Sequence, residues 1–83
     1  MDRKLLNAVI TNDINAVRNI ISRENVDKKN HDGKTVLMIA VYNNYLDIIN
    51  ILIKAGANVD LSDNDGRTAL INIVKKKLIK TGQ

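Results

Sequence analysis

Hydrophobic positions in the middle of the chain form two separate helical stripes. In the first, Leu37, Ala40 and Val41 recur at spacings of three and four residues. The second comprises Ile48, Ile49, Leu52 and Ile53. Apolar residues at this spacing share one face of an α-helix, because the helix repeats every 3.6 residues. The polar pair at residues 43–44 interrupts the pattern, which predicts two short helices joined by a turn.

Residues typical of helix ends flank these stripes. Thr35 and Thr68 each follow an Asp-Gly turn, where a hydroxyl can cap the first turn of a helix. Gly56 follows the second stripe, and glycine readily adopts the left-handed conformation beyond a helix C-terminus. Asn44 stands between the stripes, and asparagine also tolerates that conformation. The predicted unit is therefore helix, turn, helix and extended turn.

The unit recurs along the chain. Residues 32–37 (DGKTVL) match residues 65–70 (DGRTAL) at a displacement of 33, and residues 25–27 (NVD) match residues 58–60 at the same displacement. Residues 8–9 match residues 40–41 at a displacement of 32, so the first unit is one residue shorter. A fixed period of this length is typical of repeat folds, in which each unit buries its core against its neighbours.

Together the period, the D-G-x-T-x-L opening and the ending at residues 52–60 (LIKAGANVD) resemble an ankyrin repeat. The resemblance implies an all-α fold, an ankyrin-type helix-turn-helix solenoid with short extended turns. It divides a single domain, residues 1–83, into a shortened N-terminal repeat (1–31), a full repeat (32–64) and a partial C-terminal repeat (65–83). The family's T-P-L-H core is replaced by TVLM at residues 35–38, so we expect its Thr-His hydrogen bonds to be missing and the turn to be less rigid.

Composition argues against catalysis. Eighty-three residues suit one domain, and a hydrophobic fraction of 45% suits a folded core. The chain has no cysteine and one histidine, His31, whereas metal sites and catalytic triads need several such groups together. A phosphate-binding loop ending at residues 33–35 (GKT) would need a glycine where Lys28 stands. We expect no enzymatic activity, no metal and no cofactor.

The net charge of +4 is concentrated at one end of the chain. Residues 65–83 contain five basic residues and one acidic residue, including Lys75, Lys76, Lys77 and Lys80. These lysines either complement the dipole of a final helix or form a weak electrostatic adaptor for an acidic partner, anionic lipid or nucleic acid. Specific nucleic-acid recognition is not expected, because two tyrosines are the only aromatic residues.

No apolar segment reaches the length of a signal peptide or a membrane span, so we expect a soluble, cytoplasmic protein. Twelve isoleucines, twelve asparagines and nine lysines indicate an AT-rich gene. In this respect the chain resembles ankyrin proteins of obligate intracellular bacteria, with large DNA viruses as a second source, which would make the partner a host protein. We expect a monomer, with self-association through Leu78 and Ile79 as the alternative.

The resemblance implies a non-catalytic module that binds another protein through the concave face of the stacked repeats. Turn tips and the exposed side of each first helix would contact the partner. In this sequence these positions are His31, Asp32, Lys34, Tyr42, Asn43, Asn64, Asp65, Arg67, Lys75 and Lys76. Tyr42 is the expected anchor, because tyrosine is enriched among residues that dominate binding energy; packing over the neighbouring helix is its alternative role. A degenerate fragment without independent function is the remaining alternative.

Overall fold

The computed structural model describes residues 3–22 and 25–69. These residues form four helices: α1 (Lys4–Ile10), α2 (Ile14–Ile20), α3 (Val36–Asn43) and α4 (Leu46–Lys54). Within the described ranges there is no β-strand, only two isolated antiparallel bridges, Lys29 with Thr35 and Ser62 with Thr68. The all-α solenoid predicted from the repeats is confirmed.

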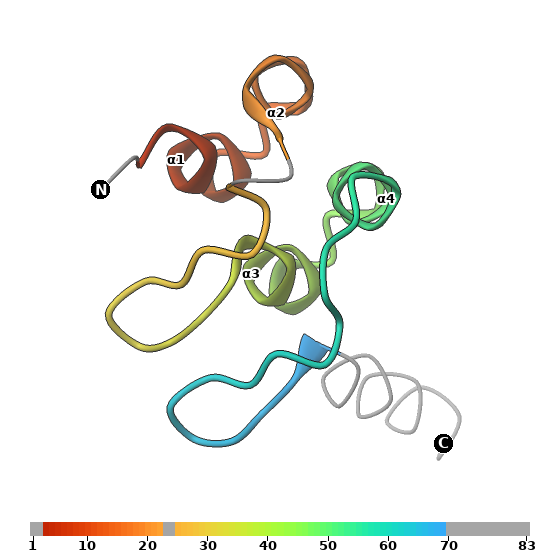
Figure 1. Cartoon of the computed structure of the whole chain (residues 1–83). Coiled ribbons are helices and arrows are strands. Elements are labelled where there is room, and N and C mark those ends of the chain that lie inside the picture. The colour runs from red at the N-terminus through yellow and green to blue at the C-terminus, as the bar shows by residue number, and fades with distance from the viewer. Residues whose placement is uncertain (1–2, 23–24, 70–83) are drawn as a thin grey trace.

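The helices stack in two columns. Figure 1 looks along the helices and shows α1 beside α3 in one column and α2 beside α4 in the other. Residues 29–35 and 62–68 form two hairpin-like projections, here called the first and second fingers, which extend to the same side of the stack. Each helix has seven to nine residues, too few to be stable alone in water, so the stacking contacts must supply the stability.

The core lies between the columns. Leu37, Ala40 and Val41 are each at most 2% exposed, which confirms the stripe predicted for the first helix. Within residues 3–22 and 25–69 the buried apolar residues are Leu5, Ala8, Val9, Val17, Val26, Val36, Leu37, Met38, Ala40, Val41, Ile48, Leu52 and Ala69. Members from three units pack into one cluster, as expected of a fold in which a single unit cannot enclose its own apolar face.

One position of the second predicted stripe is wrong. Ile48 and Leu52 are fully buried, but Ile53 is 46% exposed. At 100° per residue, Ile53 lies 140° around the helix from Ile48, so it points away from the column that α4 covers. The apolar face of α4 is therefore narrower than its composition indicates.

The predicted helix ends are present in the central unit. The hydroxyl of Thr35 accepts a hydrogen bond from the backbone N–H of Met38 (3.3 Å). Asn44 ends α3 in the left-handed conformation at φ 61°, and Gly56 follows α4 at φ 95°. Asn12, displaced by 32 residues from Asn44, repeats the left-handed turn between α1 and α2 at φ 55°. The cap predicted at Thr68 concerns residues that lie mostly beyond residue 69, outside the described part of the chain.

Met38 partly replaces the hydrogen bond that the missing histidine would have supplied. Its thioether sulfur accepts from the backbone N–H of Thr35 at 3.4 Å, so each of the two residues bonds to the backbone of the other. Sulfur is a weak acceptor. The expected loss of side-chain hydrogen bonding in this turn was therefore only partly right.

Candidate functional site

Each finger is closed by the same set of local hydrogen bonds. Oδ1 of Asn30 accepts from the backbone N–H groups two and four residues later, at 3.0 and 2.9 Å. Oδ1 of Asp63 accepts the equivalent pair in the second finger, both at 2.9 Å. Gly33 and Gly66 complete the turns at φ 75° and 79°. The two fingers thus present their side chains from matching backbones.

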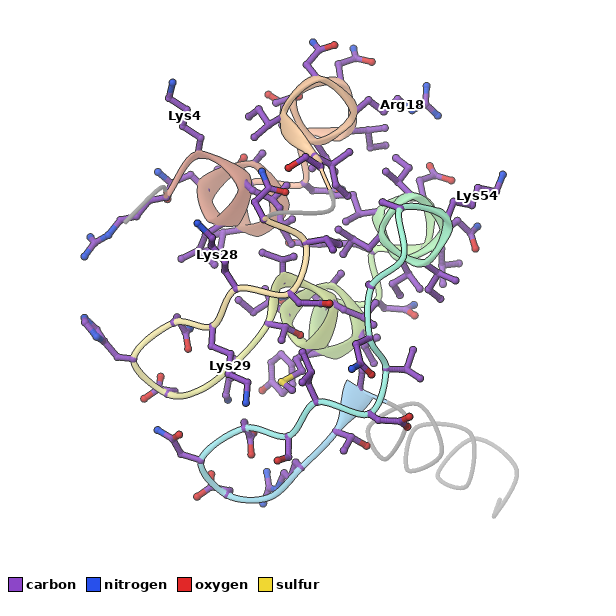
Figure 2. All side chains as sticks on the ribbon, in the orientation of Figure 1. Lys4, Arg18, Lys28, Lys29 and Lys54 are labelled. Atoms are coloured by element: carbon purple, nitrogen blue, oxygen red, sulfur yellow. The ribbon has the colours of Figure 1, made fainter. Side chains whose placement is uncertain are left out.

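The fingers are also bonded to each other. Nδ2 of Asn64 donates to the carbonyl of His31 and its backbone N–H donates to the carbonyl of Asp32, both at 3.0 Å. Nζ of Lys29 donates to the carbonyl of Ser62 at 2.7 Å, and Figure 2 shows this side chain pointing toward the second finger. Asn64, expected among the partner-binding residues, has its amide engaged within the protein.

A cavity of about 230 Å³ lies between α3 and the second finger. Its lining residues are Lys34, Met38, Ile39, Tyr42, Asn43, Asp63 and Arg67. Tyr42 is 76% exposed. The amide of Asn43 donates to the carbonyl of Ile39 at 2.9 Å, which fixes its position on the helix. We call this the second cavity; it brings together four of the residues that the sequence singled out, Lys34, Tyr42, Asn43 and Arg67.

Charges at the rim of the second cavity are of both signs. The hydrogen bond from the backbone N–H of Arg67 is the main reason that the pKa of Asp63 lies below its ordinary value. Partial desolvation opposes this effect, whereas the N–H of Asp65 and the positive charges of Lys34 and Arg67 reinforce it. Asp63 therefore stays ionised near neutral pH and partly offsets the two cations beside it.

A similar cavity of about 260 Å³ lies between α1 and the first finger. We call it the first cavity. It is lined by Arg3, Leu5, Leu6, Asn7, Asn25, Lys28, Lys29, Asn30, His31, Asp32, Lys34 and Val36. Leu6 occupies the place of Met38 at a displacement of 32, and Asn30 that of Asp63 at a displacement of 33. Part of the lining is therefore equivalent in successive repeats, and Lys34 lines both cavities.

Comparison with known proteins agrees with this architecture. A family model described as three copies of ankyrin repeats matches residues 5–81. The chain belongs to the ankyrin repeat family. It is 35% identical over 71 residues to an ankyrin repeat protein of fowlpox virus, strain NVSL, covering 84% of this chain and 10% of the viral protein. The crystal structure of the ankyrin repeat protein EF0377 is similar with a TM-score of 0.71 and 25% identity, over 94% of this chain and 44% of that one.

The chain spans about a tenth of the curated relative it matches. Ankyrin repeats in general are protein-protein interaction modules, and their family and fold are typically non-catalytic.

The other candidate residues that the structure describes do not line the second cavity. His31 and Asp32 line the first cavity. Asp65 is exposed at the tip of the second finger and lines neither cavity. Lys75 and Lys76 lie outside the described residues.

Sequence reasoning missed three cations of the first cavity, Arg3, Lys28 and Lys29. A signal for two of them was present, because Lys28 and Lys29 stand where the first finger begins, and the matching residues of the second finger are Leu61 and Ser62. A strict comparison of the repeats would have marked this as a charge difference between equivalent sites. Arg3 stands before α1 at the N-cap position that Thr35 holds before α3, and it makes no side-chain cap hydrogen bond there.

Within residues 3–22 and 25–69, no three histidine, cysteine, aspartate or glutamate side chains lie close enough together to hold a metal ion. None of the helices in those ranges has the length and hydropathy needed to cross a bilayer.

Proposed function

We propose that this ankyrin repeat protein is a non-catalytic module that binds a segment of another protein along the face formed by α1, α3 and the two fingers. The observation that carries the proposal is the second cavity, where an apolar floor, an exposed aromatic side chain and charged groups of both signs lie together.

The cavity has the arrangement expected of a protein-binding surface. Met38 is 3% exposed and Ile39 partly buried, so they form an apolar base. Tyr42 stands beside them at 76% exposure, and Lys34 and Arg67 lie at the edge. Protein interfaces are enriched in aromatic and arginine side chains at their dry centre and in polar groups at the rim. Covering Tyr42 with a partner would remove a large apolar area from water at a small cost in side-chain entropy.

The two cavities supply a continuous surface. Lys34 lines both, so an extended segment crossing the first finger would contact the two sites in succession. Stacked repeats favour such contacts because they present equivalent positions at regular intervals on one face.

The experiment is selection of peptides from a random displayed library on the immobilised full chain, followed by affinity measurements with variants. Tyr42→Ala is expected to weaken the selected peptides by more than about tenfold, as is usual for an aromatic anchor. Asn50→Ala, at an exposed position of α4, serves as the control. Peptides that lose affinity on Asn50→Ala and keep it on Tyr42→Ala would refute the proposed binding face.

A further inference from the structure

Positive charge is concentrated in the first cavity. Arg3, Lys28, Lys29 and Lys34 line it together with His31, and Asp32 is the one carboxylate among the lining residues that the structure describes. The ammonium group of Lys29 is directed at the carbonyl of Ser62, which leaves Arg3, Lys28 and Lys34 as the principal cations. All three have exposed side chains. Figure 2 shows Lys28 on the side of the first finger that faces α1.

Two of these cations have neutral counterparts in the next repeat. Lys28 and Lys29 correspond to Leu61 and Ser62, neither of which lines the second cavity, and the neutral Asn30 corresponds to the ionised Asp63, which does. The described lining of the first cavity therefore carries a clear excess of cations, whereas Lys34, Arg67 and Asp63 nearly balance one another in the second. Both fingers have the same hydrogen-bonded backbone, so the charge difference between them comes from their side chains.

The size and lining of the first cavity favour the side chains of a peptide as its ligand over a small-molecule anion or a nucleic acid. Its 260 Å³ is below the 300–1,000 Å³ that is typical of small-molecule sites. Leu5, Leu6 and Val36 supply an aliphatic floor. Neither Tyr42 nor Tyr45 lines it, so His31 is the one ring among its described lining residues, and a row of aromatic side chains for stacking the successive bases of single-stranded nucleic acid is lacking there.

We propose that the first cavity selects an acidic partner segment, in which carboxylates flank an aliphatic side chain. The aliphatic group would lie on Leu6 and the carboxylates against Arg3, Lys28 and Lys34. This inference rests on the proposed function. It adds the chemistry of the partner segment and identifies the repeat that binds it. Charge complementarity of this kind raises association rates and excludes partners of the wrong charge.

The test uses the full chain and fluorescein-labelled peptides that alternate glutamate with leucine, with glutamine-for-glutamate peptides and a single-stranded oligonucleotide as comparisons. The variant Arg3→Gln/Lys28→Gln removes two cations from the cavity. The variant Arg18→Gln/Lys54→Gln removes the same two charge types from α2 and α4, on the column remote from the fingers (Figure 2). Melting curves establish that both variants are folded.

The glutamate peptide is expected to bind and to lose about fivefold in affinity with Arg3→Gln/Lys28→Gln, and less than about twofold with the control pair. Added salt should also weaken binding of the glutamate peptide, because salt screens the attraction between exposed charges. Equal binding of the glutamate and glutamine peptides, with sensitivity to Tyr42→Ala, would overturn the acidic preference and leave the proposed binding face intact. Equal losses in both charge variants, preference for the oligonucleotide, or no binding of any probe would each overturn the inference, while the library selection judges the proposed function separately.

Discussion

Replacing Gly33 with alanine tests whether the two fingers are held together by Asn64. Gly33 adopts φ 75°, a conformation that residues with a Cβ rarely adopt. A Cβ at this position would lie 2.5 Å from Oδ1 and 2.9 Å from the backbone nitrogen of Asn64. Gly66 is its counterpart in the second finger, with φ 79° and no described atom within 4 Å of the added carbon. The pair separates backbone strain from the contact between fingers.

Gly33→Ala is expected to lose more folding stability than Gly66→Ala, although the backbone strain is the same in both. At both glycines the left-handed conformation costs alanine roughly 1–2 kcal/mol. The lower conformational entropy of the unfolded alanine variant offsets about 0.4–1 kcal/mol of this cost. Gly66→Ala should therefore destabilise by about 1 kcal/mol. In Gly33→Ala the second finger must also move, which breaks the two hydrogen bonds from Asn64 to the first finger. At about 0.5–1.5 kcal/mol each, their loss brings the total to about 2–4 kcal/mol.

Thermal unfolding followed by circular dichroism measures the difference. Each kcal/mol lowers the melting temperature of a domain of this size by about 4–8 °C. Gly66→Ala should melt about 5 °C lower than the parent and Gly33→Ala at least about 10 °C lower. The double variant Gly33→Ala/Asn64→Ala should lose less than the sum of its single changes, because both remove the same hydrogen bond. Equal losses at the two glycines, or strict additivity, would refute the idea that Asn64 holds the fingers together.

Three further comparisons follow from the described contacts. Tyr42→Ala should leave the melting temperature nearly unchanged, whereas Tyr45→Ala should lower it, because Tyr45 packs against the core and its hydroxyl donates to a backbone carbonyl of α1 at 3.5 Å; similar losses would reassign Tyr42 to the core. Denaturant titration should show a loss of about 2–5 kcal/mol for Ile48→Ala and less than about 1 kcal/mol for Ile53→Ala, and a reversed order would contradict the orientation of α4. The lowered pKa of Asp63 means that its contribution to stability is present above the ordinary aspartate pKa of about 3.9 and is lost as pH falls through the folded value. Asp63→Asn should keep both backbone hydrogen bonds and lose less stability than the parent when the pH is lowered from neutral to below the pKa of Asp63. An acid-unfolding profile identical to that of the parent would contradict this assignment.

Much of the helical framework could be predicted from local patterns. The stripe of Leu37, Ala40 and Val41, the cap at Thr35 and the left-handed turn at Asn44 all follow from interactions within a few residues. Such features depend on helix periodicity and on the side chain's own backbone preferences. They can therefore be predicted without knowledge of the residues that pack against them.

The candidate site was only partly predictable. The repeat placed Lys34, Tyr42 and Arg67 on one face, and these three line one cavity. The role of Asn64 between the fingers was not predictable, because its partner carbonyl is 33 residues away. Its amide looks like any exposed polar group in a turn until the register of the stack is known.

The amino-acid sequence by itself determined the repeat period, the positions of the turns and the family, because these depend on spacing along one chain. Only the tertiary structure decided that Arg3 and Lys28 face a common cavity, that Asn64 bonds across two fingers and that Ile53 is left outside the core. Each of these outcomes depends on which residues of neighbouring repeats come into register. Stacking sets that register through the packing of buried side chains, and the charges at the surface then take the positions that the core allows.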